Sequence, residues 1–210
     1  MDRRARRIDR FFAVNPAHAE RHLAHPYFEV RTLAARYASP FRLTALIADP
    51  EPDVRAMVAF RLPLARLGPL MNDPEPRVRI ALAQRLTGEA LAELFVDPEY
   101  AVRLAAARRA EPGLIVRLLD DPDPSVRREV AYRAPPYVLP RMTHDPDPLV
   151  RIAVAERISE GPLALMASDE DFRVRFVCAE RLPVERLSAL VEDEDDVVRD
   201  AALRRLIPEG

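Results

Sequence analysis

Lysine and tryptophan are absent from this sequence of 210 residues, and cysteine and glycine are scarce. All 32 residues counted as lysine or arginine are arginine, and the chain holds one cysteine, five glycines and 21 prolines. A single cysteine excludes a disulfide framework and any metal or iron–sulfur site that draws several thiolates from this chain. The few glycines form no Gly-x-Gly-x-x-Gly, P-loop or Gly-x-Ser-x-Gly pattern, so the common nucleotide-binding and hydrolase motifs are missing.

Long apolar runs are missing as well. No stretch approaches the roughly 18 apolar residues of a membrane-spanning helix, and the first residues, MDRRARRIDRFFAV, lack the apolar core of a signal peptide. Apolar residues still make up 49% of the chain and charged residues 31%, which is enough to build a buried core. The net charge of −2 argues against a generally cationic nucleic-acid binder. We therefore expect a cytoplasmic protein.

Internal repetition is the dominant feature of the sequence. The string Asp-Pro-acid-Pro-x-Val-Arg, with its prolines replaced in some copies, recurs every 24 residues without insertion or deletion. In every copy a second arginine follows six residues after the first. The initial aspartates are Asp49, Asp73, Asp97, Asp121, Asp145, Asp169 and Asp193. The first arginines, called here the ladder arginines, are Arg55, Arg79, Arg103, Arg127, Arg151, Arg175 and Arg199. The second arginines are Arg61, Arg85, Arg109, Arg133, Arg157, Arg181 and Arg205.

The repeats predict two regions in the chain. Residues 1–24 do not fit the pattern and are interpreted as an N-terminal helical cap. The repeat solenoid spans residues 25–210, and its first copy is degenerate, with His25 in place of the aspartate. The repeats start at residues 25, 49, 73, 97, 121, 145, 169 and 193, and the last one is incomplete.

Each repeat predicts one α-helix followed by a shorter element. The acid at the third position of the string suits a helix N-terminus, and the proline after it suits the first helical position. In the second complete repeat, Val78, Leu82 and Leu86 are four residues apart and form one apolar stripe. The Leu-x-x-Leu pair that comes later has the spacing of a single helical or 3₁₀ turn. The prolines that end the helix in their repeats are Pro63, Pro135 and Pro183.

The length of the repeat limits the possible solenoids. Two α-helices of average length and their connections need roughly 28 residues, so within 24 residues one element must be short. Tetratricopeptide, ankyrin and HEAT periods are longer, and the Leu-x-Leu strand of ordinary leucine-rich repeats is missing. No strand signal occurs in any repeat. We predict an all-α solenoid with an architecture like that of HEAT and armadillo proteins.

At this point the motif resembles a known family. Asp-Pro-Asp-Pro-x-Val-Arg, a helix of the type Val-Ala-x-Arg-Leu-Pro and the 24-residue period are similar to the leucine-rich repeat variant (LRV) family over about residues 25–210. The resemblance implies α-helices alternating with 3₁₀-helices, stacked in two layers into a right-handed superhelix, in a bacterial protein. Some members of the family carry an N-terminal cysteine cluster that binds a 4Fe-4S centre. Residues 1–24 contain no cysteine, so we expect no cofactor here.

The ladder arginines have two possible roles. Their alignment could form a surface that binds phosphates. Acids recur with the same period, however, and each arginine could pair with aspartates of neighbouring turns in a structural ladder. Residues 25–168 balance 19 arginines against 19 acids, as mutual pairing requires. We prefer the structural interpretation.

The N-terminal segment holds two further candidate sites. Five arginines precede Phe11 and Phe12, as in a capping helix or in a basic helix that binds a partner, nucleic acid or a membrane surface. These arginines are Arg3, Arg4, Arg6, Arg7 and Arg10. His18 and His22 are four residues apart and, with His25, form a candidate zinc site; the alternative is a surface or capping role.

Aromatic residues break the repeat pattern at a few places. Tyr100 and Phe172 replace the second proline, Tyr132 takes a usually polar position, and Tyr137 follows two prolines. They are candidate contacts for a binding partner, or a sign of local repacking. Cys178 falls at an apolar helix position and is expected to be buried and inert.

These observations predict a non-enzymatic repeat scaffold that binds another macromolecule, preferably a protein, on its exposed curved surface. The alternative is binding of nucleic-acid phosphates by the aligned arginines. An enzyme similar to HEAT-like lyases is a third possibility, for which no catalytic residue can be named. We expect a monomer with a protein partner and with no metal, cofactor or membrane partner.

Overall fold

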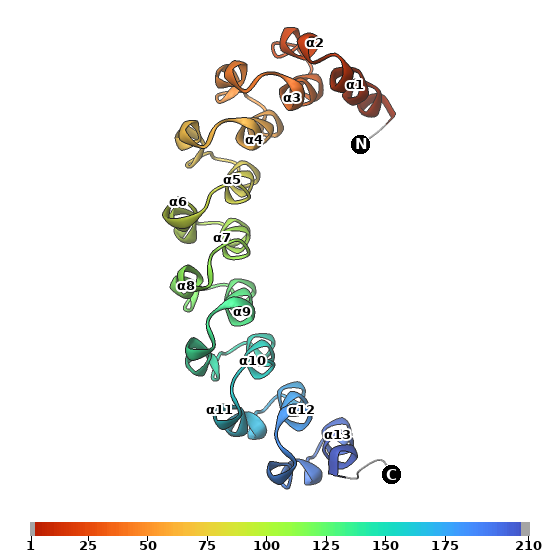
Figure 1. The fold of residues 1–210 in the computed structure, drawn as a ribbon, viewed down its shortest axis with the longest axis vertical. Coiled ribbons are helices and arrows are strands. Elements are labelled where there is room, and N and C mark those ends of the chain that lie inside the picture. The colour runs from red at the N-terminus through yellow and green to blue at the C-terminus, as the bar shows by residue number, and fades with distance from the viewer. Residues whose placement is uncertain (1–2, 207–210) are drawn as a thin grey trace. The chain divides into compact units, whose positions relative to one another are not determined.

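The computed structural model describes residues 3–206, and every regular element in this range is an α- or 3₁₀-helix (Figure 1). This confirms the all-α prediction. The chain divides after Ala110 into two compact units, called here the N-terminal unit (3–110) and the C-terminal unit (111–206). The boundary falls inside the repeat that starts at Asp97, between its helix and its second element, where the repeat pattern shows no interruption.

The N-terminal unit begins with two helices that precede the repeats, α1 (Arg3–Val14) and α2 (Pro16–Arg21), and both pack against the first repeat helix. The repeat helices form a first layer: α3 (Phe28–Tyr37), α4 (Pro52–Arg61), α5 (Pro76–Ala83) and α7 (Tyr100–Ala107). The short elements form a second layer: η1 (Pro40–Leu46), η2 (Leu64–Arg66), η3 (Gly68–Leu70), α6 (Gly88–Ala92) and η4 (Glu93–Val96).

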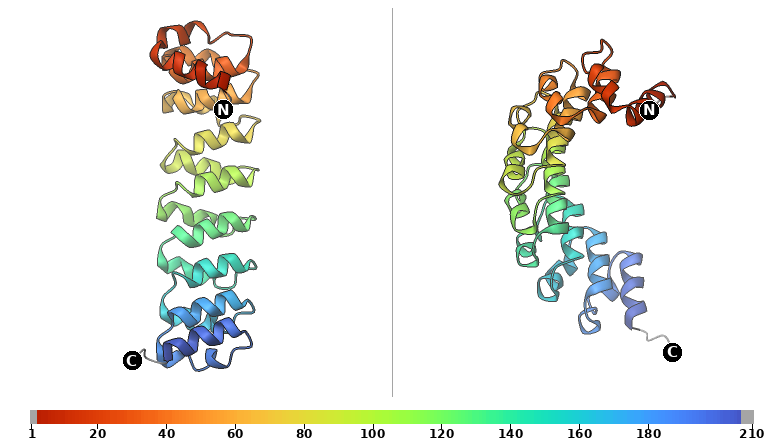
Figure 2. Two further views of the ribbon diagram at one scale, coloured as in Figure 1. Left: turned by 90° about the vertical axis from the view of Figure 1, so that its right-hand side faces the viewer. Right: turned by 45° about the horizontal axis from the view of Figure 1, so that its top comes forward.

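The C-terminal unit repeats the same two layers. Its first layer consists of α9 (Pro124–Arg133), α10 (Pro148–Ala155), α12 (Phe172–Arg181) and α13 (Asp196–Leu206). Its second layer consists of α8 (Pro112–Ile115), η5 (Val116–Leu118), η6 (Pro136–Met142), α11 (Glu160–Leu165), η7 (Met166–Ser168), η8 (Val184–Arg186) and η9 (Leu190–Glu192). Within each unit the first-layer helices lie side by side in chain order (Figure 2).

The helices start where the sequence places their signals. Prolines open four of the repeat helices, at Pro52, Pro76, Pro124 and Pro148, where a missing N–H costs no hydrogen bond. In the C-terminal unit the aspartate before this position caps the helix, and the Asp147 carboxylate accepts the Leu149 N–H at 2.7 Å. The glutamates that occupy the same place in the N-terminal unit make no such hydrogen bond.

Where each first-layer helix ends depends on the residue at one position of the repeat, the position that Pro63 occupies in the repeat starting at Asp49. Where it is a proline, the helix runs for ten residues and stops at the arginine two places before it, as at Arg61 before Pro63. The residue before a proline avoids the α region, and Leu62 is accordingly extended (ψ 148°). Where it is another residue, as at Thr87, Glu111 and Ser159, the helix has eight residues and the second layer begins with a short α-helix. The degenerate first repeat differs: it has Ser39 at this position and Pro40 after it, and its helix has ten residues and is followed by a 3₁₀-helix. Leu86 therefore lies beyond the end of α5, not on its third turn as the stripe predicted, although its side chain is still buried.

The core of each unit lies between the two layers and is built from equivalent positions of successive repeats. From α4 onward, each helix of the first layer contributes a fully buried valine: Val54, Val78, Val102, Val126, Val150, Val174 and Val198. The second layer contributes an aliphatic residue that is at most 1% exposed: Leu43, Leu67, Leu91, Ile115, Leu139, Leu163 and Leu187. Since each repeat supplies only part of a core, it is stable only when stacked on its neighbours.

Candidate functional site

The ladder arginines are held between consecutive repeats. In the N-terminal unit, Arg55 donates from Nε and Nη2 to the two carboxylate oxygens of Asp73, at 2.6 and 2.8 Å. Its Nη1 turns back to its own repeat and donates to the carbonyls of Asp49 and Pro50, at 2.8 and 3.1 Å. Arg55 therefore joins the loop that starts its own repeat to the loop that starts the next one. Arg199, in the last repeat, instead pairs with Asp196 of its own helix.

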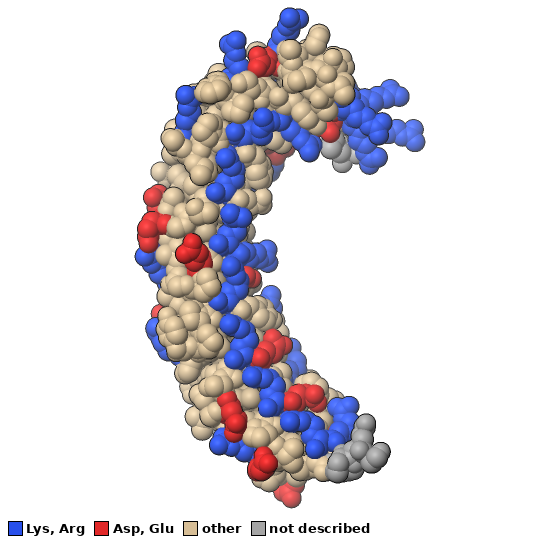
Figure 3. Space-filling view, viewed as in Figure 1, with Lys and Arg blue, Asp and Glu red and all other residues tan. Residues whose placement is uncertain are grey.

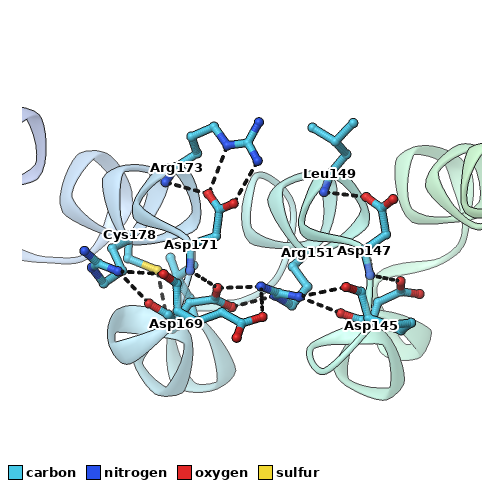
Figure 4. A network of polar contacts seen from close by, with 12 residues as sticks. Asp145, Asp147, Leu149, Arg151, Asp169, Asp171, Arg173 and Cys178 are labelled. Carbon is cyan, nitrogen blue, oxygen red and sulfur yellow. Dashed lines mark hydrogen bonds and ion pairs between the residues drawn. The ribbon is translucent and has the colours of Figure 1, made fainter. Parts of the chain in front are cut away.

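The same geometry recurs in the C-terminal unit (Figure 4). Arg151 binds Asp169 through Nε and Nη2 at 2.8 and 2.9 Å, and its Nη1 donates to the Asp145 carbonyl at 2.8 Å. The Nε–carboxylate distances along both units run from 2.6 to 2.8 Å. The pairs are Arg31–Asp49, Arg55–Asp73, Arg79–Asp97, Arg127–Asp145, Arg151–Asp169 and Arg175–Asp193.

The aspartates of the ladder are buried and also order the backbone. The side chain of Asp73 is 4% exposed, and its Oδ1 accepts the Glu75 N–H at 2.9 Å. Burial raises the pKa of Asp73, but the hydrogen bonds from Arg55 and Glu75 more than offset it, so its pKa lies below the ordinary value. The Arg175 guanidinium likewise holds the pKa of Asp193 below its ordinary value. A bidentate, buried pair of this kind is a structural element whose donors are in use.

The second arginines have a different task. Arg85 donates from Nη1 to the carbonyls of Ala59 and Leu62, which end the helix of the preceding repeat, at 2.7 and 2.5 Å. Arg205 makes the same two bonds to Ala179 and Leu182, at 2.7 and 2.6 Å. These side chains satisfy carbonyls that a helix C-terminus leaves without partners. Arg109 stands apart, because its side chain is exposed and makes no such bond within residues 3–206.

Grooves open between consecutive loops of the second layer. One of them, about 690 Å³ and called here the 165 groove, lies in the C-terminal unit, and the ladder residue Arg151 is part of its lining. Its walls include Pro140, Pro146, Pro162, Leu165 and Met166. A similar groove of about 380 Å³ in the N-terminal unit is lined by Pro74, Pro98 and Val96 around Arg79. Leu165 and Val96 are 81% and 86% exposed, so apolar side chains project at the groove edges.

The four predicted aromatic contacts are exposed but separate. Tyr100 and Phe172 are the first residues of α7 and α12, Tyr132 is near the end of α9, and Tyr137 lies in η6. Tyr137 is the most exposed of them, at 78%. No two of these rings are in contact anywhere in the range 3–206. The apolar groove residues Leu165 and Val96 were missed, although both depart from the mostly polar or small residues of the equivalent places.

The three N-terminal histidines lie among aromatic rings. His22 and His25 stack with ring centroids 6.0 Å apart, and His18 meets the edge of Phe11 at 5.5 Å. His22 Nδ1 lies 2.7 Å from the His18 carbonyl oxygen, and His25 Nδ1 accepts the Tyr27 N–H at 3.1 Å. No group of three potential metal ligands is assembled in the part of the chain that the structure describes.

Cys178 is fully buried in α12, which confirms the expectation from the sequence. Its Sγ donates to the Leu163 carbonyl at 3.6 Å, and burial raises the pKa of the thiol to about 12. A thiol of this pKa is not a nucleophile at neutral pH. None of the helices between residues 3 and 206 combines the length and apolar character that crossing a bilayer requires.

Known proteins are similar to this chain in sequence and in fold. A family model described as "Leucine rich repeat variant" matches residues 52–75, 100–123 and 124–147. A stretch of 50 residues is 58% identical to an "Uncharacterized 27.7 kDa protein in nifB 3'region" of Rhodobacter capsulatus; it makes up 24% of this chain and 20% of that protein's length.

A solved structure matches over nearly the whole chain. It is described as "a leucine-rich repeat variant with a novel repetitive protein structural motif", and the two chains are 41% identical with a TM-score of 0.90. The match covers 96% of this chain and 86% of that chain. With this identity over nearly the whole length, and with the same helical repeat, the chain belongs to the leucine-rich repeat variant family.

Proposed function

We propose that this repeat scaffold is not an enzyme and that it binds an extended segment of another protein along the loop edge of its second layer. The observation that carries the proposal is the 165 groove, in which prolines and the exposed side chain of Leu165 surround a cavity of about 690 Å³. Tyr137, which lies in the same second layer, is proposed as a flanking contact. Tyr100, Tyr132 and Phe172 are proposed as contacts of the first layer.

The recurrence of the grooves suits an extended partner. Packed helices are about 8–10 Å apart, so successive grooves recur at about that spacing. A polyproline II segment rises about 3.1 Å per residue with three residues per turn and presents the same face about every 9 Å. Such a segment could place one apolar side chain in each groove without changing its conformation. Grooves lined with prolines and apolar residues are a known way to dock preformed segments of this kind.

The chemistry of the ladder supports a protein partner over a nucleic acid at this edge. A phosphate needs guanidinium donors that are free to bind it. In the ladder, Nε and Nη2 are used by a carboxylate and Nη1 by carbonyls, as at Arg55 and Arg151. The aligned arginines therefore support the structural interpretation.

The absence of catalysis is proposed on similar grounds. The repeated aspartates accept hydrogen bonds from arginine and from backbone N–H groups, which leaves them poorly suited to exchange protons with a substrate. The thiol of Cys178 is buried and protonated.

The test is selection from a random library of 12-residue peptides displayed on phage, followed by titration of the enriched peptides. We expect peptides with an apolar residue or proline at every third place, and Leu165→Glu should weaken their binding at least about tenfold, because it places a charge in an apolar contact. The matched control is Val184→Glu, at an exposed valine of η8 outside the groove, which should leave the affinity within twofold. Equal losses in both variants, or enriched peptides without the three-residue spacing, would contradict the proposed mode of binding.

A further inference from the structure

A chain of aromatic rings lines a hollow at the start of the N-terminal unit. The rings follow one another from Phe11 to Phe12 (5.7 Å between centroids), to His22 (5.4 Å), to His25 (6.0 Å) and to Tyr27 (5.6 Å). The hollow measures about 400 Å³, which is in the range of sites that hold small molecules or single bases. Phe11 and Tyr27 are 45% and 61% exposed, so ring surface is available to a ligand.

Arginines of α1 stand over the same hollow. Arg4 and Arg7 line it together with the rings, and the guanidinium carbon of Arg4 lies 6.0 Å from the centroid of Tyr27. Basic side chains gather over α1 with few acids among them (Figure 3). The exposed arginines of this helix are Arg3, Arg4, Arg6, Arg7 and Arg10.

These arginines differ from those of the repeats, because none of them forms an ion pair with another residue in the range 3–206. The one acid within α1, Asp9, is already bound to α3: it accepts hydrogen bonds from Arg36 Nη1 at 3.2 Å and from the Tyr37 hydroxyl at 2.8 Å. The positive charge of the helix is thus left for an external anion.

The arrangement of α1 distinguishes between possible anions. Phe12 is 2% exposed and α1 packs against α3, so this ring, one of the two phenylalanines that a membrane-surface helix would insert, is already covered. The carboxylates of an acidic peptide would pair with the arginines but would not stack on the aromatic rings. Bases inside a duplex are stacked on each other and cannot reach the rings. Unpaired bases stack on aromatic side chains while their phosphates meet arginines.

We propose that this hollow binds single-stranded nucleic acid, with bases stacked on Tyr27 and Phe11 and phosphates held by Arg4 and Arg7. The site is separate from the loop-edge grooves, and the proposal does not rest on the proposed function. It explains why arginines that form no ion pair within residues 3–206 are placed beside exposed rings.

The experiment is fluorescence anisotropy of the full chain with 15-residue oligonucleotides of deoxythymidine and of uridine, at about 50 and 200 mM salt. Both are expected to bind, more weakly at the higher salt. The double variant Arg4→Gln/Arg7→Gln should reduce the slope of log K against log salt by about 1.4, because each contact to a single strand contributes about 0.7. A preference for one oligonucleotide would identify DNA or RNA as the source of the shared base and phosphate chemistry.

Stacking is tested separately from charge. Tyr27→Ala should weaken binding about fivefold or more, which corresponds to the loss of one stacked base. The matched control is Phe41→Ala, since Phe41 is also exposed and carries the Arg66 guanidinium carbon 6.0 Å from its centroid; it should change the affinity less than twofold. Circular dichroism establishes that each variant is folded.

Several results would overturn the proposal. One is no binding of either oligonucleotide at about 50 mM salt, the low end of the usual range. Another is equal binding by Tyr27→Ala and the unchanged chain, which would leave only non-specific charge attraction. Equally tight binding of a duplex, of poly-glutamate or of vesicles that contain phosphatidylglycerol would assign the surface to another partner.

Discussion

The two compact units are built from the same repeat motif but differ in net charge. Residues 1–110 contain 18 arginines and 13 acids, a net charge of +5, whereas residues 111–210 contain 14 arginines and 21 acids, a net charge of −7. The ladder does not cause the difference, because the same arginine–aspartate pairs occur in both units. The excess arginines lie in α1, and exposed acids such as Glu170 and Glu194 lie in the loops of the C-terminal unit. The repeated residues thus serve stability, and the residues that vary distinguish the surfaces.

The units also differ in how their helices begin. In the C-terminal unit the carboxylates of Asp123, Asp147 and Asp171 accept a backbone N–H of the first turn. The glutamates at the equivalent places of the N-terminal unit, for example Glu75, make no such bond. Glutamate has one more methylene than aspartate, and its carboxylate does not fold back onto the turn. The N-terminal unit therefore has less helix stabilisation from capping.

Acidification should have the largest effect, because it acts on carboxylates of both units at once. The ladder aspartates Asp49 and Asp73 of the N-terminal unit and Asp193 of the C-terminal unit have pKa values below the ordinary 3.8, as does Asp171, which caps α12. A carboxyl whose pKa is lower in the folded than in the unfolded chain stabilises the fold above about pH 3.8 and loses this contribution as the pH falls through its folded value. Hydrogen exchange with mass spectrometry on the full chain should show both units opening below this pH. Protection that survives in one unit alone would show that the ladders are not equivalent.

Removal of one ladder arginine should come next. Arg79→Ala and Arg151→Ala each leave a buried aspartate without its partner, and we expect a loss of about 3–5 kcal/mol in either unit. Denaturant unfolding of the full chain measures it. The control is Arg77→Ala, which removes an exposed pair with Asp53 and should have a much smaller effect. A ladder variant with no larger effect than the control would mean that its arginine is not structural.

Cavities in the core should cost about as much or slightly less. Leu67→Ala and Leu187→Ala remove equivalent, fully buried side chains of the second layer, one in each unit. A loss of about 2–5 kcal/mol is expected for each, from the lost burial and the cavity left behind. Thermal unfolding followed by circular dichroism compares the two. A much smaller loss in one unit would show that its layers can close around the missing side chain.

Exchange of the capping residues should have the smallest effect and tests the second difference directly. Asp147→Ala should destabilise the C-terminal unit by about 1 kcal/mol, since it removes the bond to the Leu149 N–H. Glu75→Asp should stabilise the N-terminal unit by up to about that amount, because aspartate can cap the α5 N-terminus. Both are measured by denaturant unfolding, with Glu75→Gln as the control that changes charge without shortening the side chain. No gain in Glu75→Asp would refute the explanation of the difference in capping.

Much of the fold could be predicted from the sequence because it depends on local signals repeated many times. The period, the helix starts at Pro52 and Pro124 and the helix end before Pro63 each follow from a single residue type. The choice between an α-turn and a 3₁₀-turn in the second layer could not be predicted, because Leu-x-x-Leu fits both hydrogen-bond patterns. In the structure, the second layer starts with a 3₁₀-turn where a proline follows the first-layer helix of the repeat, and with an α-turn where it does not.

The candidate sites were predictable only in part. The ladder geometry depends on acids and arginines with one period, and its residues could be named in advance. The groove around Leu165 depends on how far neighbouring loops project, and the ring sequence from Phe11 to Tyr27 depends on how α1 folds back onto α3. Neither can be read from spacing along the chain.

The reach of each ladder arginine has a consequence for how such a chain can change in length. Arg55 binds a carboxylate 18 residues ahead and a carbonyl six residues behind, and Arg151 does the same. Duplication or deletion of one complete 24-residue module keeps the separation between each paired arginine and aspartate, whereas insertion or deletion of a single residue between them changes it and breaks that link. The gene can therefore grow or shrink in whole modules, each new copy arriving with the links that join it to its neighbours.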